Sequence, residues 1–351
     1  MHVKDLLEKA VQKNAADIFI VAGLPVSYRI EGVIIQAGAL KLTPEQTYEF
    51  LKQIYELHES DMSKLLSHGD DDFSFAIAGL SRFRVNAYKQ RGTLSAVIRV
   101  ITFTLPSPEI LGIPQNIIHT GDLPKGMVLV TGPAGSGKST TLACIIDYIN
   151  KYKQKHIITL EDPIEYLHRH NRCIVSQREI NVDTESYVTA LRASLRQSPD
   201  VILLGEMRDY ETIEVAMTAA ETGHLIFSTL HTLGAANTIE RIIDVFPAGE
   251  KTQIAMQLSL VLQCIVSIQL VPDIHGQQIA AFEIMTLTPA IRNMIRDNKI
   301  PQIEGMLYSS NKPDMISMDT SLHNLYKEGR ITKETALEYA TNPEMLKKKL
   351  N

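Results

Sequence analysis

Residues 127–139 read Met-Val-Leu-Val-Thr-Gly-Pro-Ala-Gly-Ser-Gly-Lys-Ser, and this stretch decides how the chain folds. A short apolar run passes directly into a loop of the form G-x4-G-K-S. The residues from Thr140 to Ile149 then have helical composition. The order of strand, glycine-rich loop and helix is the context that distinguishes a phosphate-binding loop from a chance match. The stretch therefore predicts a P-loop nucleotide-binding core.

The composition of this loop explains how it would hold phosphate. Glycines let the backbone come close to the phosphates, and the start of the following helix adds a favourable dipole. We expect Lys138 to reach the β- and γ-phosphates and the Ser139 hydroxyl to ligate Mg²⁺. ATP and Mg²⁺ are thus the expected cofactors. The expected nucleotide contacts are Gly132, Pro133, Ala134, Gly135, Ser136, Gly137, Lys138, Ser139 and Thr140.

Two further apolar runs end in carboxylates. Residues 201–206 read Val-Ile-Leu-Leu-Gly-Glu, and residues 158–162 read Ile-Thr-Leu-Glu-Asp before Pro163. Ligands of open α/β sheets bind at the carboxyl ends of the strands, so we expect Glu206 and Glu161 at that edge. Glu206 could orient or deprotonate an attacking water. With Ser139, both acids are expected to hold Mg²⁺, partly through water.

Two histidines, His224 and His231, lie at either end of another apolar run, residues 225–229. Side chains seven residues apart in a strand point to opposite faces, so we expect no metal site made by this pair alone. From the residues alone, both are most simply structural.

The length of 351 residues favours two domains, because single hydrophobic cores usually stop growing at roughly 250 to 300 residues. Residues 1–103 are predicted to form a small α+β domain. Its expected elements are a helix over 3–14, a helix capped by Thr43 with Pro44 at its first position, and strands over 17–21, 26–30, 72–77, 82–86 and 94–100.

Residues 104–114 are predicted to be the linker, since three prolines and a glycine exclude a continuous helix there. Beyond it, apolar runs alternate with helical segments, which is typical of a mostly parallel sheet. The predicted strands are 127–131, 156–160, 201–204 and 225–229, and helices are expected from about residue 288 onward.

Composition limits the classes of function. The formal net charge of -5 and the lack of tryptophan argue against a nucleic-acid partner, whose binders usually carry a basic stripe. Cys144, Cys173 and Cys264 are isolated and predict buried thiols in a reducing compartment. No signal peptide and no apolar run of about 20 residues is present, so we expect a cytoplasmic protein that meets membranes only through a partner.

Taken in order, the P-loop, the acidic segment 161–165, the segment Gly205-Glu-Met-Arg-Asp209 and the two histidines resemble a known set of motifs. They are similar to the Walker A, Asp box, Walker B and His box of the GspE/PilT superfamily of secretion ATPases. The resemblance covers nearly the whole chain. It implies an α/β fold with a RecA-like P-loop ATPase core over 115–351, a PAS-like N-terminal domain over 1–103 and C-terminal helices.

Within this superfamily, residues 290–297 (Ala-Ile-Arg-Asn-Met-Ile-Arg-Asp) and 317–322 are most similar to the PilT type of pilus retraction ATPase. Ala134, Met294 and Asp297 depart mildly from that pattern. The resemblance implies a homohexameric motor that retracts type IV pili in twitching motility. It also implies an inner-membrane platform protein of the PilC type as partner and a location at the inner face of the cell membrane.

The resemblance also implies roles for single residues. Arg84 and Arg99 would meet phosphate charge during catalysis, and His231 would act with them. Arg192 and Arg196 would lie at a subunit interface, on one helix face at i and i+4; a plain solvated helix face is the alternative. His224, Arg292 and Arg296 are assigned to the interface or to coupling with the pilus machinery. For residues 290–297 the alternative is that Ile291, Met294 and Ile295 simply dock the helix on the core.

Other functions fit the same motifs less well. Within the superfamily, an accessory retraction motor of the PilU type or a type II secretion ATPase remains an alternative. A regulatory subunit that binds nucleotide without hydrolysing it would have no need of Glu206. A nucleic-acid translocase with a RecA-like core would be stimulated by nucleic acid, and the charge of the chain argues against it.

Overall fold

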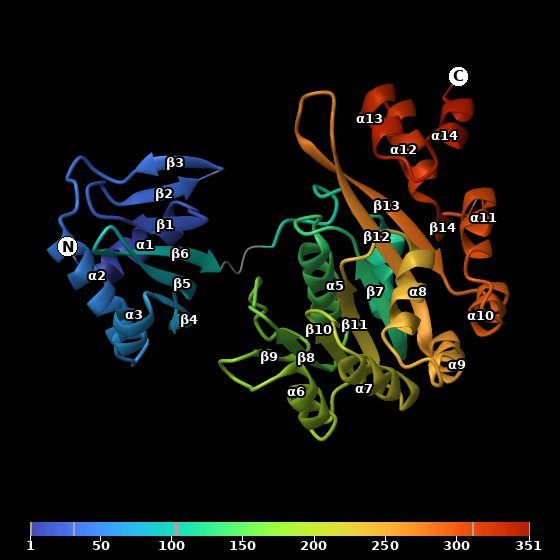
Figure 1. The fold of residues 1–351 in the computed structure, drawn as a ribbon, viewed down its shortest axis with the longest axis horizontal. Coiled ribbons are helices and arrows are strands. Elements are labelled where there is room, and N and C mark those ends of the chain that lie inside the picture. Colours follow the sequence, from blue (N-terminus) through green and yellow to red (C-terminus); the bar gives the residue numbers. More distant parts are fainter. Residues whose placement is uncertain (1, 31, 102–104, 311, 351) are drawn as a thin grey trace. The chain divides into compact units, whose positions relative to one another are not determined.

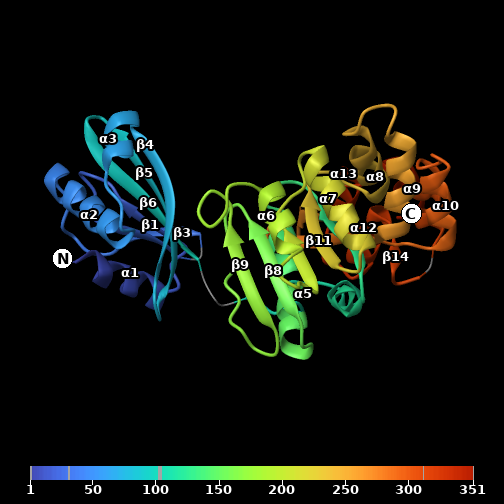
Figure 2. The same cartoon turned by 90° about the horizontal axis from the view of Figure 1, so that it is seen from below.

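The computed structural model describes residues 2–30, 32–101, 105–310 and 312–350. The chain divides into two compact units. One comprises Met1–Thr104 with Glu165–Leu167, and the other comprises Leu105–Ile164 with His168–Asn351. The elements of both units are labelled in Figure 1 and seen from a second direction in Figure 2.

The first unit is a six-stranded antiparallel sheet with helices packed on one face. Its strand order is β3-β2-β1-β6-β5-β4. Its elements are α1 (Val3–Gln12), β1 (Asp17–Ile20), β2 (Ser27–Ile30), β3 (Val33–Gln36), α2 (Pro44–Leu57), α3 (Ser63–His68), β4 (Asp70–Ile77), β5 (Ser81–Gln90) and β6 (Thr93–Ile101).

Strand alternation explains this packing. Phe83, Val85 and Ala87 of β5 point into the core beneath α2, while the residues between them face the other side of the sheet. The expected strands are confirmed, and Thr43 caps α2 in a capping box with Gln46. β3 and α3 were not predicted. All four residues of β3 are exposed, so this edge strand has no alternating pattern to detect.

The second unit is built on an eight-stranded sheet of order β14-β13-β12-β7-β11-β10-β8-β9. Strands β12, β7, β11, β10, β8 and β9 run parallel to one another. β13 pairs antiparallel with β12, and β14 pairs antiparallel with β13. The first elements are α4 (Gln115–Ile118), the 3-10 helix His119–Asp122, β7 (Gly126–Thr131), α5 (Lys138–Tyr152), β8 (His156–Glu161), β9 (Ile174–Glu179), α6 (Tyr187–Ser194), β10 (Val201–Leu204), α7 (Tyr210–Glu221) and β11 (Leu225–Leu230).

The remaining elements are α8 (Ala235–Asp244), α9 (Lys251–Val261), β12 (Leu262–Pro272), β13 (Gln278–Thr286), α10 (Pro289–Arg296), α11 (Gln302–Ser309), β14 (Met315–Ile316), α12 (Met318–Lys327), α13 (Lys333–Glu338) and α14 (Pro343–Lys349). The RecA-like α/β fold is thereby confirmed, as are helices from residue 289 onward. In the parts of the chain that the structure describes, no helix is both long and apolar enough to cross a bilayer.

Both faces of this sheet are buried, which is why its strands appear in the sequence as unbroken apolar runs. Val128 and Val130 of β7 pack with α5 on one face. Met127 and Leu129 of the same strand pack on the other face, in the core that also includes residues of α6 to α11. The central strands therefore lie between two helical layers, as Figure 2 shows.

The long hairpin β12–β13 was not predicted. α9 ends at Val261 and β12 begins at Leu262, so no turn residue separates the helix from the strand. The apolar residues of both elements therefore read as one segment. The far part of the hairpin carries the C-terminal helices, since Val271 and Ala281 share a small core with Met318, Leu322 and the residues of α13 and α14.

Glu283 of β13 links the sheet to the first turns of α8 and α12. Its side chain is buried, and its two carboxylate oxygens accept hydrogen bonds from the backbone N–H of Ala235, at 2.7 Å, and of Met318, at 3.2 Å. These residues are the first of α8 and α12, where a negative charge is favoured. Burial nevertheless raises the pKa of Glu283, against the lowering effect of the two hydrogen bonds.

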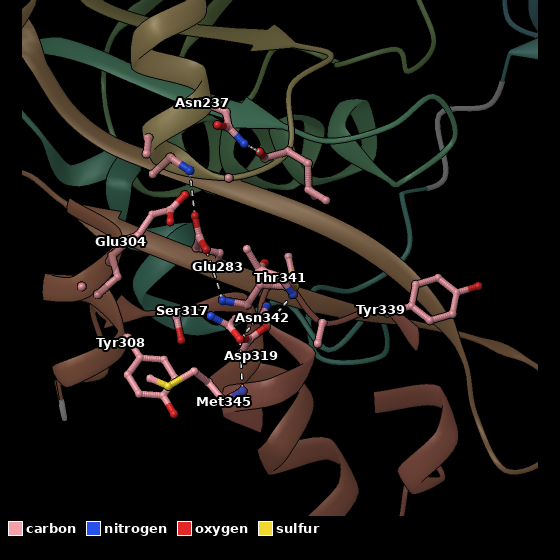
Figure 3. Close-up of a pocket in the computed structure, with 18 residues that line it drawn as sticks. Asn237, Glu283, Glu304, Tyr308, Ser317, Asp319, Tyr339, Thr341, Asn342 and Met345 are labelled. Carbon is pink, nitrogen blue, oxygen red and sulfur yellow. Dashed lines mark hydrogen bonds between the residues drawn. The ribbon is translucent and has the colours of Figure 1, made fainter. Parts of the chain in front are cut away.

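A cavity of about 340 Å³ lies beside Glu283 (Figure 3). Asp319, the second buried acid in its wall, accepts hydrogen bonds from the backbone N–H of Thr341 and Asn342, just before α14. Buried carboxylates thus satisfy backbone donors at the starts of α8 and α12 and just before α14. They fix these helices to the core.

Candidate active site

The predicted motifs meet at one edge of the second sheet. Strands β7, β11, β10 and β8 are consecutive neighbours and run parallel, so their carboxyl ends point the same way. Thr131 pairs with Leu230, and Leu204 pairs with both Ser228 and Leu160. The segments that follow these four strands therefore begin at nearly the same level of the sheet.

The P-loop starts with an unusually close approach to the neighbouring strand. Gly132 has φ of 142°, and a Cβ atom on it would lie 2.2 Å from the carbonyl oxygen of Ile268 in β12. No side chain can be accommodated there. Gly137, with φ of 93°, precedes α5 directly. The loop thus begins against β12 and ends at a helix N-terminus.

Lys138 holds the loop in shape from inside. Its side chain is buried, and Nζ donates hydrogen bonds to the carbonyl oxygens of Gly132, at 3.0 Å, and Pro133, at 2.8 Å. Pro133, Ala134 and Gly135 form the exposed rim. Ser139 and Thr140 lie in the first turn of α5.

The donors around this loop fit a phosphate ligand. Within the described residues, the buried hydroxyls of Thr131 and Ser136 have no hydrogen-bond partner in the protein. Ser136 Oγ lies close to Gly132, 2.7 Å from where a Cβ on that residue would be. Buried polar atoms are nearly always hydrogen-bonded, so these two hydroxyls are suited to a ligand with acceptor oxygens.

Glu206 is held from both sides. Its carboxylate is 13% exposed, with Oε1 at 2.6 Å from Arg208 Nη2 and Oε2 at 3.5 Å from His231 Nε2. The preceding residue, Gly205, is tied to the sheet through its N–H, which donates to the Leu160 carbonyl at 2.8 Å. His231 is thus brought to Glu206, and the orientation of the carboxylate is fixed. Sequence reasoning gave Arg208 no role, although its position two residues after the acid was a usable signal.

Glu161 ends β8 at the same edge. Its Oε1 accepts hydrogen bonds from Thr159 Oγ1, at 2.6 Å, and from Gln177 Nε2 on β9, at 3.3 Å. The two acids that the sequence singled out thus follow neighbouring strands. Glu206 follows β10 and Glu161 ends β8, two and three strands from β7 in the sheet. Both therefore lie at the carboxyl edge, where Mg²⁺ ligands and water-orienting groups are expected.

The two histidines are separated by the whole length of β11. His224 precedes the strand and His231 follows it, at either end of the strand as the sequence predicted. His224 Nδ1 lies 2.9 Å from the Ala219 carbonyl oxygen, at the edge of the sheet away from the P-loop. Only His231 belongs to the site.

Arg192 and Arg196 do not share a helix face. α6 ends at Ser194, so Arg196 lies in the turn beyond it and donates from Nη1 to the carbonyl oxygen of Arg192 at 3.3 Å. The i,i+4 expectation is wrong because the helix is two residues too short. Their assignment to a subunit interface remains a prediction.

Arg84 and Arg99 lie in the first unit, directly opposite each other on β5 and β6. Two like charges opposite each other on neighbouring strands would repel. Each guanidinium is therefore paired with a carboxylate. Arg84 Nη2 lies 2.7 Å from Asp72 Oδ2, and Arg99 Nε lies 3.1 Å from Asp17 Oδ1. Their role toward the nucleotide remains a prediction.

The helix α10 confirms its predicted apolar stripe, since Ile291 and Ile295 are fully buried. Arg292, however, is not part of a free polar face. Its Nη1 donates to the carbonyl oxygens of Ser259, at 2.5 Å, and Leu260, at 3.0 Å, at the C-terminal end of α9. A cation there satisfies open carbonyls and complements the helix dipole.

Arg296 is the exposed arginine of this helix. It contacts only its neighbours Asn293, at 2.9 Å, and Asp297, at 3.6 Å, among the interactions that the structure describes. The two arginines that the sequence treated as equivalent therefore differ, because one joins two helices and the other borders solvent.

Comparisons with known proteins agree with this architecture. The family described as "Type II/IV secretion system protein" matches residues 1–341. The type IV pilus retraction ATPase PilT of Pseudomonas aeruginosa is 44% identical over 98% of this chain and 99% of its own length. The type IV pilus ATPase PilU of the same organism is 39% identical over 97% of this chain and 89% of its own.

Among solved structures, the pilus retraction motor PilT with bound ADP superimposes with a TM-score of 0.90. The two chains are 44% identical, and the match covers 99% of each.

We expect Arg292→Ala to destabilise the protein, because two carbonyls at the end of α9 lose a charged donor. The free energy of unfolding should fall by about 1.5 to 3 kcal/mol. Arg296→Ala is the matched control on the same helix and should change it by less than about 0.5 kcal/mol. Chemical denaturation of both variants measures this, and equal small effects would show that the Arg292 contact is not stabilising.

Proposed function

Because the chain belongs to the type II/IV secretion system protein family, we propose that it is an ATP-hydrolysing motor that retracts type IV pili in twitching motility. The observation that carries the proposal is the convergence of a P-loop and the anchored carboxylate of Glu206 at one sheet edge. The similarity to PilT over nearly the whole of both chains supports the cellular role.

In this proposal the P-loop binds ATP through its backbone N–H groups, the ammonium of Lys138 and the hydroxyls of Ser136 and Thr131. Ser139, with Glu161 and Glu206 partly through water, would hold Mg²⁺, which neutralises phosphate charge when bound. The buried, unpartnered hydroxyls at the loop are the feature of this chain that favours such a ligand.

Glu206 is the proposed group that orients and deprotonates the attacking water. Its two oxygens are already engaged by Arg208 and His231, and such contacts prevent the carboxylate from rotating away. Arg84 and Arg99 are proposed to neutralise charge that develops on the phosphates in the transition state.

An accessory retraction motor of the PilU type is a second candidate. The chain is 39% identical to PilU and 44% identical to PilT, and both comparisons cover nearly all of this chain. A strain lacking this gene separates the two. Loss of retraction with pili still present indicates the principal motor, whereas an effect seen only under load or in a second mutant background indicates an accessory one.

We expect Lys138→Ala to abolish ATP binding, and Glu206→Gln to keep ATP bound while turnover falls by at least about 10²-fold, the usual scale for losing a positioned base. Cells that carry either variant should display pili but fail to twitch. Titration with a fluorescent ATP analogue and steady-state hydrolysis measure the two failures separately.

Glu214→Gln is the control for Glu206→Gln, because Glu214 is an exposed acid on α7 away from the strand ends. It should hydrolyse ATP at the parental rate. A Glu206→Gln variant with near-parental turnover would contradict the assignment of the base.

We also propose that the active species is a ring of six copies, which acts at the inner face of the membrane through a platform protein of the PilC type. Ring closure uses the same heterologous contact six times. Arg192 and Arg196 are proposed interface residues. Because Arg292 is engaged with α9, Arg296 is the better candidate on α10 for coupling to the pilus machinery.

Assembly predicts that specific ATPase activity rises with protein concentration as rings form. Light scattering with parallel activity measurements tests this directly. A monomer that is fully active at every concentration would remove the ring from the proposal.

A further inference from the structure

Tyr187 is a residue of the nucleotide edge that no motif includes. It is the first residue of α6, just after Ser186, which caps the helix through the N–H of Thr189. Its ring packs against the core that contains Leu160, Ile180 and the rest of α6. The ring is therefore anchored, and the position of its hydroxyl is set by the fold.

The hydroxyl of Tyr187 lies on the backbone between the two acids of the site. A Cβ atom on Gly205 would be 2.8 Å from Tyr187 Oη and 3.4 Å from the Cα of Glu161. Gly205 directly precedes Glu206. The hydroxyl thus occupies the point where the ends of β8 and β10 come together, which is where the two carboxylates begin.

The surroundings of this hydroxyl are acidic. Burial raises the pKa of Tyr187, and the charges of Glu206, Asp162 and Glu161 raise it further. A phenol hydroxyl is ordinarily protonated at neutral pH and can donate a hydrogen bond. Among the residues that the structure describes, Tyr187 Oη makes no hydrogen bond. Its proton is therefore available to a water molecule beside the acids.

We propose that Tyr187 is a positioning residue for hydrolysis, whose hydroxyl donates a hydrogen bond to the water that Glu206 activates. A water held by both groups has one lone pair engaged by the tyrosine and one proton directed at the carboxylate. This restricts its orientation before attack, which is the contribution expected of a positioned donor. The inference rests on the proposed ATPase function of the same site.

The first test is Tyr187→Phe, which removes the hydroxyl and keeps the packed ring. Steady-state hydrolysis of ATP should show kcat reduced at least about threefold, the effect of one lost hydrogen bond. KM for ATP, the affinity for ADP and Tm should remain at parental values. Tyr210→Phe is the control, since the Tyr210 hydroxyl lies at the exposed start of α7 near Glu211.

A kcat of Tyr187→Phe within twofold of the parent would overturn the inference, as would a loss explained by lower Tm or weaker ADP binding. The parent protein distinguishes this from failure of the proposed function. If the parent hydrolyses no ATP in its assembled form, the ATPase proposal itself fails. If the parent hydrolyses ATP and Tyr187→Phe has the parental kcat, only the inference about Tyr187 fails, and the ATPase proposal stands.

A second measurement tests the geometry without activity. Gly205→Ala should lower Tm, because its Cβ would lie too close to Tyr187 Oη. In the Tyr187→Phe background the nearest contact is gone, so the same substitution should lower Tm by a smaller amount. An equal drop in both backgrounds would show that the hydroxyl does not lie against Gly205.

Discussion

The close packing of Gly132 on the Ile268 carbonyl is the contact on which the rest of the site depends. It requires β7 to lie beside β12 and forces the backbone into a conformation that only glycine adopts readily. From that start the loop turns over Lys138, whose ammonium binds the first two carbonyls of the same loop. The Gly132 contact and the two Lys138 hydrogen bonds thus hold the first part of the loop in place.

Parallel strand order accounts for the remainder of the site. Glu161, Glu206 and His231 are far apart in the chain, yet each follows a neighbouring strand of one sheet. A parallel arrangement brings all the carboxyl ends to one edge, whereas residues that precede the strands collect at the other. The same geometry places His224, which precedes β11, at the end of the strand away from the site.

The sequence predicted those features that follow from local chemistry. The P-loop, the buried strands around it and the capped start of α2 were recognisable because residue type and conformation are coupled there. The β12–β13 hairpin was not recognisable, since α9 and β12 join without a turn. The contacts of Arg292 and Arg196 could not be predicted from the sequence, because the carbonyls that accept from them depend on where a helix ends. Tyr187 was missed because its position beside Gly205 depends on packing between segments distant in the sequence, whereas Arg208 was overlooked although it lies only two residues after Glu206.

The most direct test of this account is the nucleotide affinity of Gly132→Ala, titrated with a fluorescent ADP analogue. Gly249→Ala is the matched control, because a Cβ on this exposed glycine has open space and lies outside the P-loop. The account predicts that Gly132→Ala remains folded by circular dichroism but binds the analogue at least about tenfold more weakly, a loss of roughly 1.4 kcal/mol. Gly249→Ala should bind as the parent does. Parental affinity in Gly132→Ala would contradict the claim that the Gly132–Ile268 contact shapes the site.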